Sequence, residues 1–184
     1  MNIKGDQMEH TTSTLHTAIT LLQHYQDVCN RYEIEAAVAL FADDGYLEVH
    51  GTVYRGQSAL KAAHECDMGS QTQVSFGNYA AQDDTVSCTF TTCDVLDRAV
   101  GLDGRHMRAE FTIRNGRIVR FLSLPPDEQE RQRHFAAKHA FHTWAQTHYP
   151  DEVAKGANFD YEAGASLSRV VQAWLKRHDR DGYE

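Results

Sequence analysis

The stretch YQDVCNRYEIEAAVALFADDGYLEVHG, residues 25–51, decides the fold. It starts in the last turns of an amphipathic helix, whose apolar residues repeat every three or four positions between Thr12 and Arg31. A second helix is predicted over Glu33–Phe41, and the sequence ADDG ends it, with Gly45 suited to the turn. Tyr46–Val53 then alternates like a short strand. Two helices and a strand therefore open the chain.

Downstream of this stretch, the apolar period changes from that of helices to that of strands. A third helix is predicted over Gly56–His64, ending before Gly69. A period of two then predicts a meander of antiparallel strands over Gln71–Ala81, Thr85–Val100, Arg105–Arg114 and Arg117–Leu124. Asn115-Gly116 is a strong hairpin signal, because both residues tolerate positive φ. Helices first and strands afterwards are typical of the α+β class.

Three motifs resemble the nuclear transport factor 2-like superfamily, in particular its steroid Δ-isomerases and SnoaL-like polyketide cyclases. Residues 25–51 resemble their Tyr-bearing helix, short second helix and LFADD strand. VYRGQSAL, residues 53–60, resembles the start of their third helix, and EFTIRNGRIVRF, residues 110–121, resembles their closing hairpin. The resemblance implies a cone-shaped, curved, antiparallel mixed sheet wrapped around three N-terminal helices over residues 12–126. It also implies an apolar pocket for one small organic molecule.

Residues 127–184 lie outside the resemblance and predict a C-terminal helical extension. Asp127 can cap a helix that runs to about His148, and another helix is predicted over about Ala163–His178. The polar stretch GANFDYEAG, residues 156–164, predicts a loop between them. Both helices carry aromatic residues that must be covered. Three alternatives stay open: a lid on the open end of the cone, packing on the outer face of the sheet, or a dimer contact. Superfamily members often dimerise through the sheet, so a homodimer is expected.

Composition and charge exclude several classes of partner. The formal net charge of −8 argues against a nucleic-acid partner. No stretch is long and apolar enough for a membrane span, and the N-terminus does not resemble a secretory signal, so a cytoplasmic protein is expected. Cys88 and Cys93 do not have a zinc or redox spacing. His139 and His142, one helical turn apart, could share a metal, but a solvated polar face is preferred, and neither a metal nor a cofactor is predicted.

The resemblance implies which side chains would line the pocket. Leu47 and Val49 would face inward on the strand that follows LFADD, and period two places Asp94 on the inner face of the long strand. The implied substrate-binding set is Leu47, Val49, Phe90, Thr92, Met107, Ala109, Phe111 and Ser123.

Most catalytic groups of the superfamily have no counterpart here. The general base of the steroid isomerases falls on Val49, and their protonated Asp falls on Ala109. The Asp of the dehydratases falls on Asn30. Compared with the epoxide hydrolases of this fold, Thr92 replaces an Arg and Ser123 replaces an Asp, so each known mechanism is incomplete.

Two candidate catalytic residues remain, Asp94 and Tyr25. A carboxyl group in an apolar cavity has a raised pKa, which suits general acid or base catalysis, and a Tyr hydroxyl can stabilise an enolate. Alternatively, Asp94 pairs with Arg98 or faces solvent, and Tyr25 is a core aromatic residue. Two functions therefore stay open. One is a cofactor-free acid–base enzyme of isomerase, cyclase or lyase type, with Thr92 and Ser123 orienting an apolar substrate. The other is a non-catalytic small-molecule-binding or protein-interaction domain.

Overall fold

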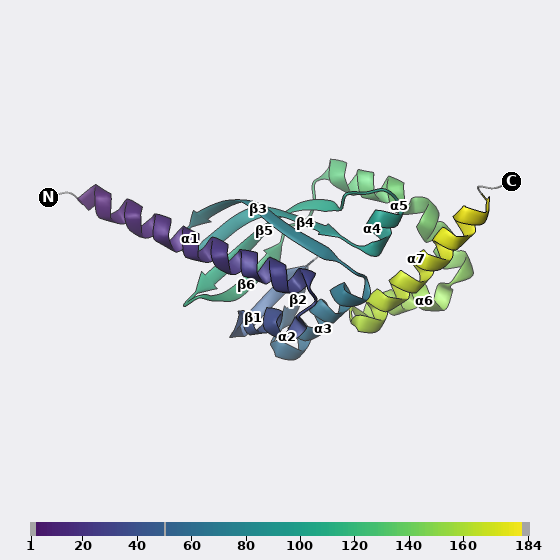
Figure 1. Ribbon diagram of the computed structural model, residues 1–184, viewed down its shortest axis with the longest axis horizontal. Coiled ribbons are helices and arrows are strands. Elements are labelled where there is room, and N and C mark those ends of the chain that lie inside the picture. The colour runs from purple at the N-terminus through teal and green to yellow at the C-terminus, as the bar shows by residue number, and fades with distance from the viewer. Residues whose placement is uncertain (1–2, 50, 182–184) are drawn as a thin grey trace.

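The computed structural model describes residues 3–49 and 51–181, and within them six strands form one sheet of order β2–β1–β6–β5–β4–β3 (Figure 1). β1 (Phe41–Val49) and β2 (Thr52–Arg55) form a short hairpin. The antiparallel meander consists of β3 (Gln73–Gln82), β4 (Thr85–Cys93), β5 (Arg105–Arg114) and β6 (Arg117–Ser123). β1 pairs with β6 in parallel, so the sheet is mixed, and the α+β prediction is confirmed.

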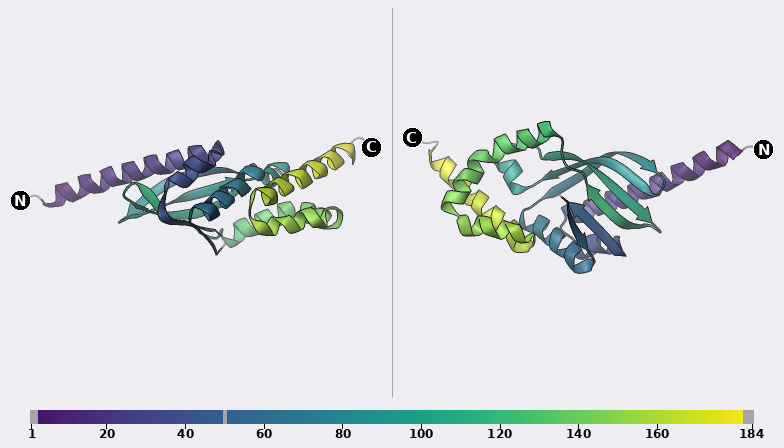
Figure 2. Two further views of the ribbon diagram at one scale, coloured as in Figure 1. Left: turned by 90° about the horizontal axis from the view of Figure 1, so that it is seen from below. Right: turned by 180° about the vertical axis from the view of Figure 1, so that it is seen from behind.

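Three N-terminal helices pack on one face of this sheet (Figure 2). They are α1 (Ile3–Asn30), α2 (Ile34–Ala39) and α3 (Gln57–Gly69). α1 starts well before the predicted Thr12, and its first turns project past the sheet (Figure 1). The shared core holds apolar residues that are almost fully inaccessible to solvent, among them Leu22, Val28, Leu60, Phe111 and Ile118.

The C-terminal helices gather at the end of the molecule opposite the start of α1 (Figure 1). They are α5 (Glu128–His148), α6 (Pro150–Lys155), the 3₁₀ turn η1 (Gly156–Asn158) and α7 (Tyr161–Asp181). α5 and α7 share a second core with the short helix α4 (Val95–Ala99), formed by Val95, Leu96, Phe141, Ala145, Val170 and Val171. The extension is therefore packed against the sheet-bearing part of the chain.

α7 crosses α3 at two glycines. A Cβ atom added to Gly69 would lie 2.5 Å from the carbonyl oxygen of Tyr161, and one added to Gly164 would collide with the carbonyl oxygen of Cys66. Ser168 Oγ donates a hydrogen bond to the Gly69 carbonyl oxygen at 2.7 Å. Glycine at both positions therefore permits the close approach that brings the start of α7 over the end of α3.

Two boundary predictions near the start of the sheet are wrong. β1 begins at Phe41, so the ADDG sequence lies within a strand and not in a turn. The pairing with β6 is irregular between Phe41 and Tyr46, and Gly45 lies in this bulge. A Cβ atom on Gly45 would come within 2.9 Å of the Ile118 carbonyl oxygen, which explains the glycine. α3 also continues to Gly69, five residues beyond the predicted end at His64.

Two further predictions are wrong in the second half of the chain. The strand predicted over Thr85–Val100 ends at Cys93, because Asp94 caps α4. Asp94 Oδ1 accepts from the backbone N–H of Asp97 at 2.7 Å, and Asp97 Oδ2 accepts from that of Asp94 at 3.1 Å, forming a capping box. Within residues 156–164, predicted as a loop, only Phe159 and Asp160 lie outside a helix or 3₁₀ turn.

Candidate functional site

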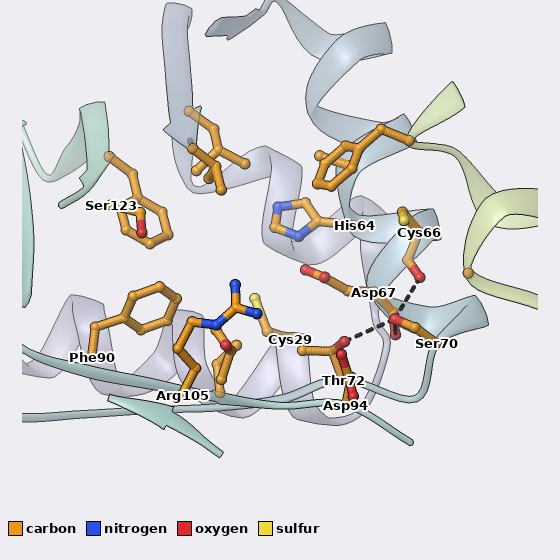
Figure 3. Close-up of a pocket in the computed structure, with 18 of the residues that line it drawn as sticks. Cys29, His64, Cys66, Asp67, Ser70, Thr72, Phe90, Asp94, Arg105 and Ser123 are labelled. Atoms are coloured by element: carbon orange, nitrogen blue, oxygen red, sulfur yellow. Dashed lines mark hydrogen bonds between the residues drawn. The ribbon is translucent and has the colours of Figure 1, made fainter. Parts of the chain in front are cut away.

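A cavity of about 350 Å³ lies between the helix-bearing face of the sheet, the end of α3 and the start of α7 (Figure 3). This volume lies within the range of ~300–1,000 Å³ that is usual for small-molecule sites. The sheet contributes most of its large apolar lining residues, which are Leu47, Val49, Val74, Phe76, Phe90, Met107 and Phe121. Polar side chains gather where α3 approaches β4 and β5. The cavity therefore suits a molecule with a large apolar body and few polar groups.

The C-terminal extension forms one wall of this cavity. Phe159, Ala163 and Leu167 are among its lining residues. Phe159 has a left-handed backbone, with φ of 50°, and its ring stacks on that of Tyr54 with 4.8 Å between centroids. The start of α7 and the turn before it therefore lie beside the cavity, and a dimer contact through the extension stays a prediction.

Eight of the ten predicted site residues line the cavity: Tyr25, Leu47, Val49, Phe90, Thr92, Asp94, Met107 and Ser123. Ala109 and Phe111 do not, although they lie on the same face of β5 as Met107, and both are fully buried. The Phe111 ring stacks on Phe121 at 4.4 Å and packs edge-on to Phe76 at 5.3 Å. Aromatic side chains thus fill the interior of the cone before the cavity reaches these two residues.

Tyr25 belongs both to the aromatic core and to the cavity lining. Its ring packs edge-on to Phe41 and His64, at 5.7 and 5.8 Å between centroids. The pKa of Tyr25 is raised well above its ordinary value, first by burial and then by the neighbouring Cys29 and Asp67. The phenol therefore stays protonated and can act as a hydrogen-bond donor.

Asp94 is a paired carboxylate and not an isolated one. Besides capping α4, its Oδ2 lies 3.6 Å from Nζ of Lys138, a buried residue of α5. The same ammonium group contacts Oδ1 of Asp97 at 2.7 Å. The alternative pairing with Arg98 is wrong, because that guanidinium donates to the carbonyl oxygens of Cys93 and Gln71, both at 2.9 Å.

Asp67 was not predicted as a site residue, yet its carboxyl group points into the cavity (Figure 3). Burial raises its pKa to about 7, and the charge on Asp94 adds to the shift. Among the side chains of residues 15–49 and 51–178, which the structure describes, none forms a hydrogen bond or ion pair with this carboxyl group. The sequence does contain a pattern that indicates Asp67, because Leu60, His64 and Asp67 share one face of a helix. A helix that ends at His64, as predicted, does not include Asp67.

Two further polar residues have distinct positions. Arg105, also not predicted, lines the cavity from the start of β5, two residues before Met107 on the same face. Asn30, which replaces the Asp of the dehydratases, instead joins α1 to β3. Its Nδ2 donates to the Val74 carbonyl oxygen at 2.9 Å, and its Oδ1 accepts from the Val74 N–H at 2.7 Å. Asn30 therefore has a structural role.

The described part of the chain contains no group of three His, Cys, Asp or Glu residues arranged to hold a metal ion. Likewise, no helix within residues 3–49 and 51–181 is long and apolar enough to cross a bilayer. The chemically capable groups of the cavity are thus a carboxyl group that titrates near neutrality, a second carboxylate paired with Lys138, and a neutral phenol. Such a set can move a proton and stabilise an oxyanion.

No protein-family model matches the chain, and no curated protein matches its sequence. Solved structures do match its fold. A candidate polyketide cyclase from Sinorhizobium meliloti has a TM-score of 0.51 at 17% identity, over 57% of this chain and 94% of that one. Another from Xanthomonas campestris pv. campestris has a TM-score of 0.51 at 22% identity, over 64% and 95%.

A third similar structure is an epoxide hydrolase/cyclase-like enzyme of pyran ring formation in the polyether salinomycin. Its TM-score is 0.50 at 17% identity, over 60% of this chain and 91% of that one. Identities this low indicate a shared fold and leave the activity open. The chain therefore has the nuclear transport factor 2-like cone fold, which it shares with these solved structures.

Proposed function

We propose that the protein is a cofactor-free acid–base enzyme of isomerase, cyclase or lyase type, acting on an apolar small organic molecule. The observation that carries this proposal is the Asp67 carboxyl group, which faces an apolar cavity with a pKa of about 7. A general base is most effective when its pKa lies near the working pH. The assignment moves the proton-transfer role from Asp94 to Asp67.

In the proposed reaction, the ionised Asp67 takes a proton from a carbon next to a substrate carbonyl. The C–H bond breaks and its electron pair moves onto the carbonyl oxygen, which becomes an enolate. The Tyr25 hydroxyl donates a hydrogen bond to that oxygen and stabilises its charge. Protonated Asp67 then returns the proton to the same or another carbon. Asp94, which lies 3.6 Å from Nζ of Lys138, adds to the raised pKa of Asp67 through its charge.

Exchange of the benzylic α-protons of 2-tetralone in D₂O tests this proposal with an apolar bicyclic ketone. Proton NMR measures the loss of the C1–H signal. The wild type is expected to accelerate exchange, and Asp67→Asn to lower the catalysed rate by about 100-fold or more, as expected for loss of a general base. Asp44→Asn, which changes an exposed carboxyl group of β1, is the matched control and should retain the wild-type rate. Equal rates for wild type and Asp67→Asn would refute the role of Asp67.

A non-catalytic small-molecule-binding domain is the second candidate, favoured by Val49 and Ala109 at the positions of two catalytic residues of the steroid isomerases. Fluorescence titration with 2-naphthol, a planar mimic of the tetralone enolate, distinguishes the two candidates. Binding of 2-naphthol without exchange of 2-tetralone would favour the binding domain. Homodimer formation and a cytoplasmic location stay predictions from the sequence, and sedimentation velocity tests the first.

A further inference from the structure

Arg105 places a cation in the cavity that the proposed acid–base chemistry does not use. It lies at the start of β5, and its guanidinium group extends toward the middle of the cavity (Figure 3). Other arginines at this end of the sheet have partners. Arg98 binds two carbonyl oxygens, and Arg133 binds Glu130 and Asp103. Among the side chains that the structure describes, those of residues 15–49 and 51–178, no partner forms a hydrogen bond or ion pair with the guanidinium group of Arg105.

The two carboxyl groups of the cavity do not neutralise this cation. Asp94 is paired with Lys138 and accepts the N–H of Asp97, and it forms no ion pair with Arg105 within 4 Å. Asp67 is largely protonated below a pH of about 7, because burial disfavours its charged form. A guanidinium group that is partly removed from water without a counterion is costly, and an anionic ligand would remove that cost.

We infer that the ligand of this cavity carries a carboxylate in addition to its apolar body, and that Arg105 binds the carboxylate. The planar guanidinium fork matches two carboxylate oxygens, which gives direction as well as affinity. The apolar body would then lie along Phe90, Met107 and Phe121. The inference shares its cavity with the proposed function and does not depend on the proton transfer. It names the substrate class as apolar carboxylic acids.

Paired ligands of equal shape test this inference. Calorimetric titration compares 2-naphthoate with 2-naphthamide, which has the same ring and no charge. Wild-type protein is expected to bind the acid at least tenfold more tightly than the amide. Arg105→Gln should remove this preference, weakening the acid at least tenfold and leaving the amide within twofold of wild type. Arg105→Lys keeps the positive charge but lacks the two parallel N–H donors of the guanidinium group, so it should retain only part of the preference for the acid.

Arg108→Gln is the matched control, because it removes the same charge from the same strand on the opposite, exposed face. It should bind both probes as the wild type does. Equal affinity of the wild type for acid and amide would overturn the inference, and so would an unchanged preference in both Arg105 variants. These outcomes would leave 2-tetralone exchange unaffected. If the protein does not exchange 2-tetralone protons but still prefers 2-naphthoate through Arg105, the proposed reaction is refuted and the carboxylate site is not.

Discussion

At the scale of single residues, Asp67 and Asp94 show how one cavity can hold two carboxyl groups in different environments. Asp94 has a cation, the Lys138 ammonium group, and a backbone N–H as partners. Asp67 has neither, and it is buried beside the charge of Asp94. Two titratable groups in different environments are the usual basis for dividing acid and base roles. The surroundings of Asp67, more than its residue type, therefore raise its pKa and suit it to proton transfer.

Replacing Asp94 by Asn should lower the pKa of Asp67, because the negative charge that adds to its shift is removed. The pKa should nevertheless stay above the ordinary value of 3.8, since burial is the larger cause. Asn caps helices about as well as Asp, so α4 should persist. Carbon-13 NMR titration of the Asp carboxyl carbons measures the shift. Asp84→Asn, at an exposed ion pair with Arg114, is the control. An unchanged Asp67 pKa in Asp94→Asn would contradict the coupling.

Eight of the ten residues predicted from the resemblance and strand alternation line the cavity, whereas the sequence analysis does not name the lining residues Asp67 and Arg105. The end of α3 was placed at His64, which removed Asp67 from the helical face that carries it. Arg105 lies on the same strand face as Met107, but the predicted inward set began at Met107 and left Arg105 out. Ala109 and Phe111 lie on the predicted inner face of β5, but the packed aromatic rings separate them from the cavity.

At the scale of elements, local patterns predicted the meander and the two long helices of the extension well, and left the placement of the extension open. The Asn115-Gly116 hairpin is confirmed, with φ of 51° and 71° at the two residues. Hairpins depend on neighbours in sequence, so their signal is local. The contact of α7 with α3 joins residues about a hundred positions apart, as in the bond from Ser168 to Gly69. The spacing of apolar residues within a helix does not indicate which distant element the helix contacts. The sequence therefore leaves three placements of the extension open.

Gly164→Ala should destabilise the protein, although alanine is the better helix former by about 1 kcal/mol. Its added Cβ would collide with the Cys66 carbonyl oxygen and push α7 away from α3. The free energy of unfolding in urea should fall by about 1–3 kcal/mol, the usual cost of overpacking. Because α7 forms a cavity wall, 2-naphthol should also bind less tightly. Gly156→Ala is the control, since its Cβ would meet open space; equal losses in the two variants would contradict this packing.

At the scale of the whole molecule, two buried groups give folding stability opposite pH dependences. Asp67 has a pKa of about 7 when folded against an ordinary value of 3.8, so the folded state binds its proton more tightly. This contribution is fully present at low pH and is lost as the pH rises from about 4 to 7. Burial lowers the pKa of His64 to about 4 from 6.5, so its neutral form favours folding, and that contribution is lost as the pH falls from 6.5 to 4.

Between about pH 4 and 6.5, the contributions of Asp67 and His64 to folding stability change with pH in opposite directions. The pH dependence of wild-type stability alone would therefore not reveal either contribution. Comparison with Asp67→Asn isolates the carboxyl group. The variant should gain stability relative to the wild type as pH rises from 4.5 to 8, by on the order of 3 kcal/mol for a shift of this size. Urea unfolding followed by circular dichroism at both pH values measures the difference. Asp44→Asn should show no such change, and a constant difference between Asp67→Asn and wild type would mean that Asp67 titrates normally in the folded protein. The same carboxyl group would then be ionised throughout the neutral range, so it would supply a weak base and compete with a carboxylate ligand for Arg105.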